Sequence, residues 1–231
     1  GLVIGLLGYE VTGRKSETEE RLTTRDVPLL DKNAPKDTET ATLALGCFWS
    51  FDAKFGAIPG VIRTRVGYSG GTKKNPRYYN LGDYTETIQI DYDPTTITYG
   101  EILEIFWNSH NPTWSYSRQY MSIIFTHGEK QQRIAEISKR KEETKRGENI
   151  VTEIRPYKKF YLAENYHQKY YLRQRALLFD AYWQIYPETG QQINSTAMAK
   201  VNGYISGYGE IDSRDDLDGL GLTSKGKKLV S

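Results

Sequence analysis

The chain has 231 residues, with 31 Lys and Arg against 29 Asp and Glu, which gives a formal net charge of +2. This length fits one ordinary domain with a sizeable core, and 38% hydrophobic and 26% charged residues are typical of a soluble globular protein. The near-neutral charge argues against a dedicated nucleic-acid binder, and the single cysteine, Cys47, excludes an internal disulfide and a cysteine-based zinc cluster in this chain.

Residues 1–8 form a short apolar stretch, Gly-Leu-Val-Ile-Gly-Leu-Leu-Gly. No segment of the sequence approaches the ~20 apolar residues that span a bilayer. The stretch is compatible with the remnant of a signal peptide or anchor, and equally with a surface strand or a disordered start. The compartment is therefore open: cytoplasmic by default, exported or membrane-tethered if residues 1–8 are such a remnant.

Polarity divides the chain into three parts. Residues 1–40 are mostly polar and mixed in charge, which predicts an N-terminal arm or linker. Residues 41–209 are expected to form a single domain. Residues 210–231 are polar and rich in glycine, which predicts a mobile C-terminal tail.

Strand and helix patterns alternate along the domain. Short apolar or alternating runs predict strands at 41–45, 61–68, 85–92, 121–126 and 151–154. Apolar stripes and capping residues predict helical regions at 47–57, 99–109, 129–146, 163–182 and 195–203. We therefore predict an α/β or α+β fold with a mixed sheet backed by helices.

Cys47 stands where the first predicted strand meets the first predicted helix, and Gly46 before it lets a tight turn form. A helix N-terminus offers a positive dipole end and unpaired N–H groups, which favour thiolate and lower a thiol pKa that starts near ~8.5. Phe48 and Trp49 place two large rings beside the sulfur. The sequence predicts a reactive thiolate; the alternative is a structural cysteine in a small core.

Glu86 lies on a predicted strand, where side chains alternate between faces, and it shares its face with Ile88 and Ile90. A carboxyl on an apolar face is desolvated, which favours the protonated form and makes it a proton donor. The alternative is a glutamate at the start of the strand that reaches solvent.

The chain has 18 tyrosines, whose hydroxyls can bind an oxygen atom of a substrate. Those nearest to these segments are Tyr68, Tyr78, Tyr79, Tyr84 and Tyr120. His167 is a candidate Cys–His partner, or alternatively a packing residue.

The motifs of this chain resemble those of one family. In chain order they are Gly46-Cys47-Phe48-Trp49, Pro59-Gly60-Val61, Gly67-Tyr68-Ser69-Gly70-Gly71, Asn75-Pro76-Arg77-Tyr78, Thr85-Glu86 leading into Asp91-Tyr92-Asp93-Pro94, Arg118-Gln119-Tyr120, Phe160-Tyr161-Leu162-Ala163-Glu164 and Tyr166-His167-Gln168. On this pattern, which covers residues 41–172, the chain resembles the peptide methionine sulfoxide reductases of the A type. Residues 195–209 are also similar to the C-terminal part of one subgroup.

The resemblance implies a two-layer sandwich with a ferredoxin-like core, and residues 41–209 would be the catalytic domain. It implies reduction of the S epimer of methionine sulfoxide, free or in proteins, to methionine; one enzyme per epimer is expected because the sulfoxide is chiral. Cys47 would attack the sulfoxide sulfur and become a sulfenic acid, and Glu86 would protonate the oxygen. Tyr78 and Tyr120 match the hydroxyls that bind the oxygen in the family. Phe48 and Trp49 match its apolar pocket for the methyl group.

This chain departs most from the family pattern in the step that returns the oxidised Cys47 to the thiol. Many members resolve the sulfenic acid with C-terminal cysteines, but this chain has no second cysteine. An external thiol must then reduce Cys47: thioredoxin, glutaredoxin with glutathione, or a small dithiol such as dithiothreitol. We expect oxidised proteins, peptides and free methionine S-sulfoxide as partners, no cofactor, metal or nucleic acid, and a monomer.

Three further positions depart from the family pattern. Asp52 stands where the family helix carries Glu, five residues after the cysteine. Residues 111–117 contain no carboxylate, where many members have an Asp that helps to position the site. Tyr84 stands where many members have His.

Two other functions are compatible with the residues alone. One is a cysteine hydrolase that uses Cys47 with His167 as base. The other is a non-catalytic module that holds Met-containing peptides in an aromatic pocket.

Overall fold

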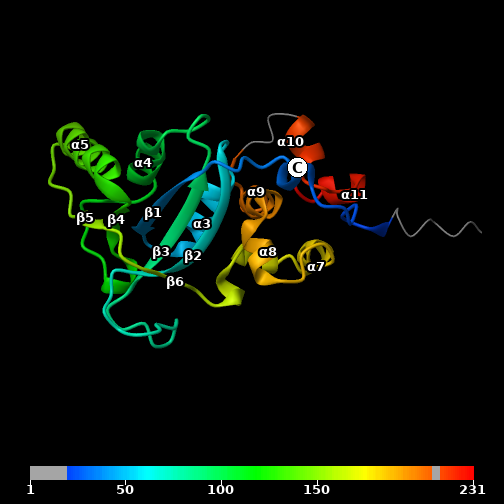
Figure 1. Cartoon of the computed structure of the whole chain (residues 1–231), viewed down its shortest axis with the longest axis horizontal. Helices are drawn as coiled ribbons and strands as arrows, with labels where there is room; N and C mark the ends of the chain where they lie inside the picture. Colours follow the sequence, from blue (N-terminus) through cyan, green and yellow to red (C-terminus); the bar gives the residue numbers. More distant parts are fainter. Residues whose placement is uncertain (1–19, 210–213) are drawn as a thin grey trace, which may run out of the picture.

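The structure, a computed structural model that describes residues 20–209 and 214–231, is built on one mixed sheet (Figure 1). Its strands are β1 (Glu39–Leu45), β2 (Val61–Ser69), β3 (Thr85–Tyr92), β4 (Ser122–Thr126), β5 (Glu153–Pro156) and β6 (Phe160–Leu162). They lie in the order β5-β4-β1-β3-β2-β6, and among these described strands only β4 and β5 pair in parallel. The predicted α/β class with a mixed sheet is confirmed.

One edge of the sheet collects the segments that carry the predicted site residues. β1 ends at Leu45, which pairs with Ser122 at the start of β4. β3 starts at Thr85, which pairs with Ser69 at the end of β2. Because β1 runs antiparallel to both β3 and β4, its end lies beside the starts of these two strands. The Cys47 turn, the start of β3 and the residues that precede β4 therefore lie close together.

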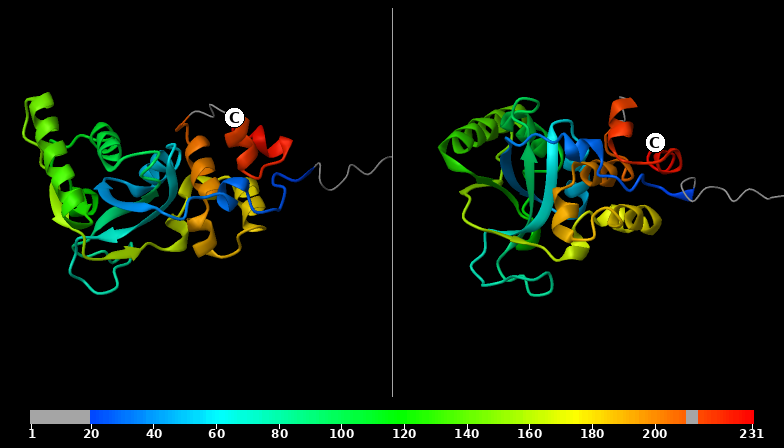
Figure 2. Two further views of the ribbon diagram at one scale, coloured as in Figure 1. Left: turned by 45° about the horizontal axis from the view of Figure 1, so that its top comes forward. Right: turned by 45° about the vertical axis from the view of Figure 1, so that its right-hand side comes forward.

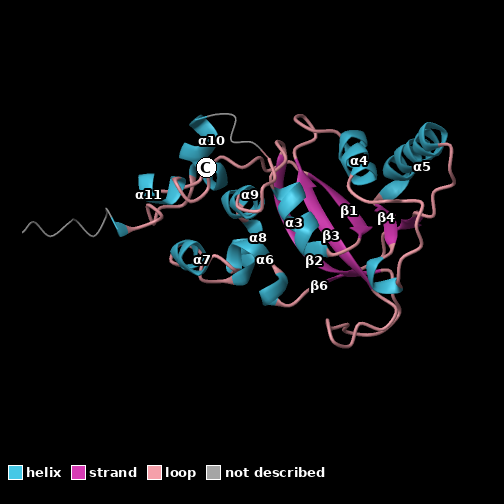
Figure 3. Ribbon diagram, turned by 180° about the vertical axis from the view of Figure 1, so that it is seen from behind, coloured by secondary structure: helices cyan, strands magenta, loops and turns pink. Residues whose placement is uncertain are grey.

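Three longer helices pack on the sheet: α3 (Phe48–Gly56), α4 (Tyr99–Asn108) and α5 (Gly128–Arg146). Figure 3 shows α3 lying across the strands, with α4 and α5 beside it. A capping box begins α4, since Thr98 Oγ1 accepts from the Glu101 N–H and the Glu101 carboxylate accepts from the Thr98 N–H. α5 ends at Gly147, whose φ of 68° is the left-handed geometry that glycine adopts without strain.

The main core lies between these helices and one side of the sheet. Its strand residues alternate along β1 and β3, as a half-buried strand requires, and include Leu43, Ile88 and Ile90. The apolar stripe predicted at 99–109 supplies Ile102 and Phe106, which are fully buried. The hydrophobic pattern thus placed Glu86, two residues before Ile88, on the side of the sheet that the helices cover.

The remaining helices gather beyond β2, at the end of the molecule opposite to α5 (Figures 1 and 2). They are α2 (Leu29–Lys32), α6 (Tyr170–Arg173), α7 (Ala176–Trp183), α8 (Thr189–Asn194), α9 (Thr196–Tyr204), α10 (Arg214–Gly219) and α11 (Ser224–Lys227). Two 3₁₀ turns, η1 (Arg118–Tyr120) and η2 (Asn165–His167), complete the described elements. No helix in the described part of the chain is long and apolar enough to cross a membrane.

The described parts of the predicted arm and tail pack against each other and against α6, α7 and α9. The Thr24 N–H donates to the Gly221 carbonyl at 2.9 Å, and the Thr223 N–H donates to the Leu22 carbonyl at 3.0 Å. Leu22, Leu220, Leu222 and Val230 are buried in a second apolar cluster with Tyr182, Met198 and Val201. The sequence pattern does not reveal this packing, because these single apolar residues are spaced within polar segments and form no local hydrophobic period. Residues 1–19, with the apolar stretch 1–8, and residues 210–213 lie outside the described residues.

The region predicted as one helix at 163–182 is broken into η2, α6 and α7. Lys169 has φ 52° and ψ 48°, a left-handed conformation that is uncommon for a residue with a Cβ and that ends a helix. The short edge strand β6 was not predicted, because three residues are too few to show a period. Both features lie beside the site and shape it.

Candidate active site

Cys47 is the residue that caps the N-terminus of α3, directly after β1. Gly46 has φ 114°, which residues with a Cβ rarely adopt, so the sharp turn between strand and helix depends on glycine. The turn leaves the Cys47 side chain exposed. A thiol is thus presented at the sheet edge where β3 and β4 begin.

The surroundings of Cys47 raise the pKa of its thiol, so the expected lowering is wrong. Although the residue is exposed, its surroundings partly desolvate the sulfur, and this desolvation is the largest cause. The N–H groups of Trp49 and Ser50 at the start of α3 do lower the pKa, as the helix argument predicts, but the negative charge of Glu86 adds to the desolvation. The thiol is therefore the favoured form while Glu86 is ionised.

Glu86 is buried, with 2% of its surface exposed, so the alternative in which it reaches solvent is excluded. Its Oε2 accepts from the Phe48 N–H at 3.1 Å, and its Oε1 accepts from Gln119 Nε2 at 3.1 Å. Burial raises the pKa of this carboxyl against the lowering effect of both bonds. Among the described residues, no lysine or arginine forms an ion pair with it.

Tyr78 and Tyr120 lie beside this carboxyl. The Tyr120 hydroxyl is close enough to Tyr78, Glu86 and Cys47 for these groups to influence its pKa. Desolvation first, and then these neighbours, raise the pKa of Tyr120 to about 12, so the hydroxyl is neutral at ordinary pH. The structure thus brings all four predicted catalytic residues together.

Phe48 and Trp49 form an ordered aromatic wall next to the thiol. The Phe48 ring centroid lies 6.0 Å from that of Tyr68. Trp49 stacks on Tyr170 with centroids 3.7 Å apart and planes 3° apart. Since each ring has several neighbours, the wall has little freedom to move.

His167 is fully buried, and both of its ring nitrogens face protein groups. Nδ1 accepts from Trp49 Nε1 at 2.9 Å, so a neutral ring carries its proton on Nε2. Nε2 faces Glu164 Oε2 at 3.5 Å. Neither nitrogen is directed to Cys47, so His167 acts on the wall through Trp49 and is not placed as a base for the thiol.

Glu164, to which the sequence pattern gave no role, joins several segments of the candidate site. Its Oε2 accepts from the Tyr68 hydroxyl at 3.3 Å, the Tyr78 N–H at 3.3 Å and the Tyr166 hydroxyl at 3.2 Å. This one oxygen ties the loop that carries Tyr78 to the segment that carries His167. In the sequence, this glutamate could have been noticed as an acidic residue that precedes Tyr166 by two positions and His167 by three, inside one of the family motifs.

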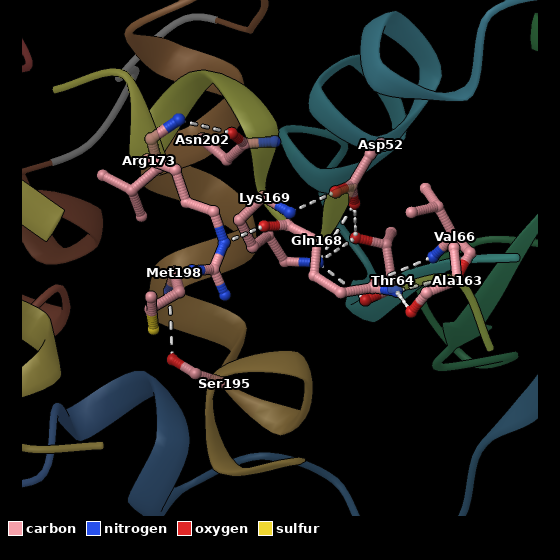
Figure 4. Close-up of polar contacts among 11 residues, drawn as sticks. Asp52, Thr64, Val66, Ala163, Gln168, Lys169, Arg173, Ser195, Met198 and Asn202 are labelled. Carbon is pink, nitrogen blue, oxygen red and sulfur yellow. Dashed lines mark hydrogen bonds and ion pairs between the residues drawn. The ribbon is translucent and has the colours of Figure 1, made fainter. Parts of the chain in front are cut away.

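A buried ion pair anchors the same segment to α3 and β2 (Figure 4). Asp52 and Lys169 are 0% and 1% exposed, and Lys169 Nζ lies 3.0 Å from Asp52 Oδ1. Lys169 Nζ also donates to the Thr64 carbonyl at 2.7 Å, and the Lys169 N–H donates to Asp52 Oδ2 at 2.9 Å. Gln168 next to it bonds both backbone groups of Val66. The pair holds Lys169 in its left-handed conformation.

A family model for peptide methionine sulfoxide reductases matches residues 39–199. This match spans the sheet, the thiol and the aromatic wall. The chain belongs to the peptide methionine sulfoxide reductases. It is an oxidoreductase of their A type.

Two relatives, one from a plant and one from an insect, are similar to this chain over most of its length. A peptide methionine sulfoxide reductase A5 of Oryza sativa subsp. japonica is 46% identical over 174 residues, which cover 72% of this chain and 68% of the relative. A peptide methionine sulfoxide reductase of Drosophila melanogaster is 42% identical over 200 residues, 85% of this chain and 79% of the relative.

Solved structures share the fold. Methionine sulfoxide reductase A of Corynebacterium diphtheriae superposes with a TM-score of 0.55 at 30% identity, over 71% of this chain and 92% of that one. Mxr1 from Saccharomyces cerevisiae in reduced form gives a TM-score of 0.56 at 31% identity, over 62% of this chain and 88% of that one.

Two departures from the reductase family pattern have a structural account here. Tyr84 is buried and its hydroxyl donates to the Lys73 carbonyl at 2.9 Å, so it supports the loop between β2 and β3. Asp52 has a shorter side chain than Glu. Its carboxylate forms an ion pair with Lys169 and accepts a hydrogen bond from the Thr64 hydroxyl. The described residues of this reductase contain no group of three or more His, Cys, Asp or Glu that could hold a metal ion.

Proposed function

We propose that this chain reduces the S epimer of methionine sulfoxide, free or in proteins, to methionine, through a sulfenic acid on Cys47. The observation that carries the proposal is Glu86: a buried carboxyl without a cation partner, bonded to the N–H of the residue after the thiol. A carboxyl in such a place favours its protonated form and is a general acid.

The step balances within the site. The S=O bond of the sulfoxide breaks and an S–O bond forms on Cys47, so the sulfoxide is reduced by two electrons and the thiol is oxidised. Glu86 gives its proton to the sulfoxide oxygen, and the Cys47 thiol proton restores Glu86. Protonation of Glu86 also removes the negative charge that raises the thiol pKa, so the acid and the nucleophile support each other.

The neutral hydroxyls and the rings position the substrate. Tyr78 and Tyr120 donate hydrogen bonds to the sulfoxide oxygen without adding charge. Phe48 and Trp49 contact the methyl group through apolar ring surface. Because the oxygen and the methyl group have separate sites, one epimer fits, and the other, in which these two groups exchange places on the sulfur, does not.

Recycling requires a thiol from outside. Cys47 is the only cysteine of the chain, so its sulfenic acid cannot form an intramolecular disulfide. Two thiols, or one dithiol, return it to the thiol, with release of a disulfide and water. Thioredoxin, glutaredoxin with glutathione, and dithiothreitol are the reductants we propose.

The deciding experiment is incubation with racemic methionine sulfoxide and dithiothreitol. We expect half of the sulfoxide to be consumed, all of it the S epimer, and no consumption by a Cys47→Ser variant. Consumption of both epimers, or turnover by the Cys47→Ser variant, contradicts the proposal.

The hydrolase hypothesis has little support from the geometry, because both His167 nitrogens face other groups. It predicts acyl-enzyme formation with ester substrates and complete loss of activity in His167→Ala. The proposed reductase keeps part of its activity in that variant, since His167 only orients Trp49. A non-catalytic Met-peptide module predicts that Cys47→Ser retains its full biological role.

A further inference from the structure

Two exposed arginines adjoin the proposed catalytic tyrosines. Arg77 directly precedes Tyr78 in the loop between β2 and β3, and Arg118 begins η1, two residues before Tyr120. The two tyrosines are close enough for Tyr78 to influence the pKa of Tyr120, and the Arg118 carbonyl accepts from Thr85 Oγ1 at 2.7 Å, at the start of β3. The two arginine backbones therefore flank the site on different segments.

Further cations extend this surface. The loop between β2 and β3 projects from the body of the molecule (Figures 1 and 2), and a cavity of about 250 Å³ lies between its first residues and residues 155–159. The exposed lysines of the loop and of this second segment are Lys74, Lys158 and Lys159. Tyr84 lines the cavity and also packs in the aromatic cluster around Phe48, so the cavity adjoins the proposed site.

The carboxylates nearby form no ion pair with these cations in the described part of the chain. Within residues 20–209 and 214–231, no carboxylate forms an ion pair with Arg77, Arg118, Lys74 or Lys158. Glu86 is buried, and Oε2 of Glu164 is taken by two hydroxyls and an N–H. Asp83 is held by Thr72, Glu153 pairs with Arg155, and residues 111–117 contain no Asp or Glu.

We propose that this basic rim, defined as Lys74, Arg77, Arg118, Lys158 and Lys159, selects polypeptides with acidic residues beside the oxidised methionine. The inference rests on the proposed function, since it names the substrate class of the same site. Exposed charges act weakly in pairs, but a cluster of one sign steers and orients an oppositely charged chain. A free amino acid does not reach the rim, whereas the neighbours of a methionine in a peptide do.

The test compares two short peptides, each with one methionine S-sulfoxide, flanked by Asp in one and by Lys in the other. We expect kcat/KM at low salt to favour the Asp peptide by about five- to tenfold. The double variant Arg77→Glu/Arg118→Glu should reverse this ratio. About 0.5 M salt should bring the wild-type ratio toward one, because the Debye screening length falls to a few ångströms. Each kcat/KM is divided by that of the same variant for free methionine sulfoxide, which removes effects on the chemistry.

Lys141→Glu is the matched control, because Lys141 is an exposed cation on α5, away from the loop. It should keep the wild-type preference. Equal kcat/KM for both peptides, or an unchanged ratio in the double variant, overturns the proposal that the basic rim selects acidic peptides. A wild-type enzyme that consumes neither peptide nor free sulfoxide overturns the proposed function instead, so the two failures are distinguishable.

Discussion

At the scale of single residues, the charge of Glu86 makes the thiolate form of Cys47 less favourable, and burial makes the charged form of Glu86 itself less favourable. Burial raises the pKa of Glu86, and desolvation together with the Glu86 charge raises the pKa of the Cys47 thiol. A site that starts with both protons in place can deliver one to the leaving oxygen as the sulfur attacks. The reactivity of Cys47 is therefore a property of the pair, and the helix N-terminus alone does not account for it.

Replacing the acid tests this role directly. Glu86→Gln keeps the size of the side chain and an oxygen for the Phe48 N–H, but it has no proton to give. We expect kcat with methionine S-sulfoxide to fall by about 10²–10⁴, with KM changed far less because the tyrosines and the aromatic wall remain. Steady-state kinetics with dithiothreitol measures both; a normal kcat in Glu86→Gln contradicts the assignment.

The same carboxyl makes a separate prediction for stability. A glutamate in the unfolded chain has a pKa of about 4.3, and burial raises it in the folded protein. Between these two values the folded state binds the proton and the unfolded state has lost it, so the free energy of unfolding falls as pH rises through this window. Glu86→Gln carries no such proton, so it should gain stability relative to wild type as the pH rises from about 4, below the unfolded pKa, to about 8. Urea unfolding at both pH values measures this; an identical difference at each pH is the contrary result.

At the scale of elements, the buried Asp52–Lys169 pair joins α3 to the segment that carries Glu164 and His167. Breaking one half leaves the other charge buried without a partner. We expect Lys169→Met to lower the free energy of unfolding by about 3–5 kcal/mol, and the double variant Asp52→Asn/Lys169→Met to recover much of that loss. Denaturant unfolding of the three variants, with the exposed Lys141→Met as control, checks this. A double variant no better than Lys169→Met speaks against the pair as the cause.

The elements show which parts of the fold a sequence can predict. β2, β3 and α4 carry their own period, so their positions were predicted to within a residue or two. β6 and the break at Lys169 depend on partners distant in the chain, the edge of β2 and Asp52. The predicted site residues do come together, because the strand ends that carry them meet at one edge. The predicted direction of the Cys47 pKa shift was wrong because the dipole of α3 is a local effect, whereas desolvation of the sulfur, and after it the charge of Glu86 on another strand, depend on the tertiary structure.

At the scale of the whole molecule, the two ends of the described chain close a second apolar cluster on α7 and α9. Leu220 is fully buried there, whereas Leu229 in the same segment is 55% exposed. If the segment is an integral part of the fold, Leu220→Ala should cost about 2–5 kcal/mol of unfolding free energy, and Leu229→Ala should cost little. Equal and negligible effects of the two substitutions would instead support the mobile tail expected from composition. Chemical unfolding monitored by circular dichroism separates these outcomes.

The central claim is that one oxygen atom passes from the S epimer of methionine sulfoxide to Cys47. Intact-mass spectrometry of the chain, mixed with each pure epimer in the absence of any thiol, tests it most directly. We expect the S epimer to add the mass of one oxygen atom per chain at Cys47, with release of one methionine, and the R epimer to add none. An unchanged mass with the S epimer while methionine is released, or oxygen on a residue other than Cys47, would contradict it.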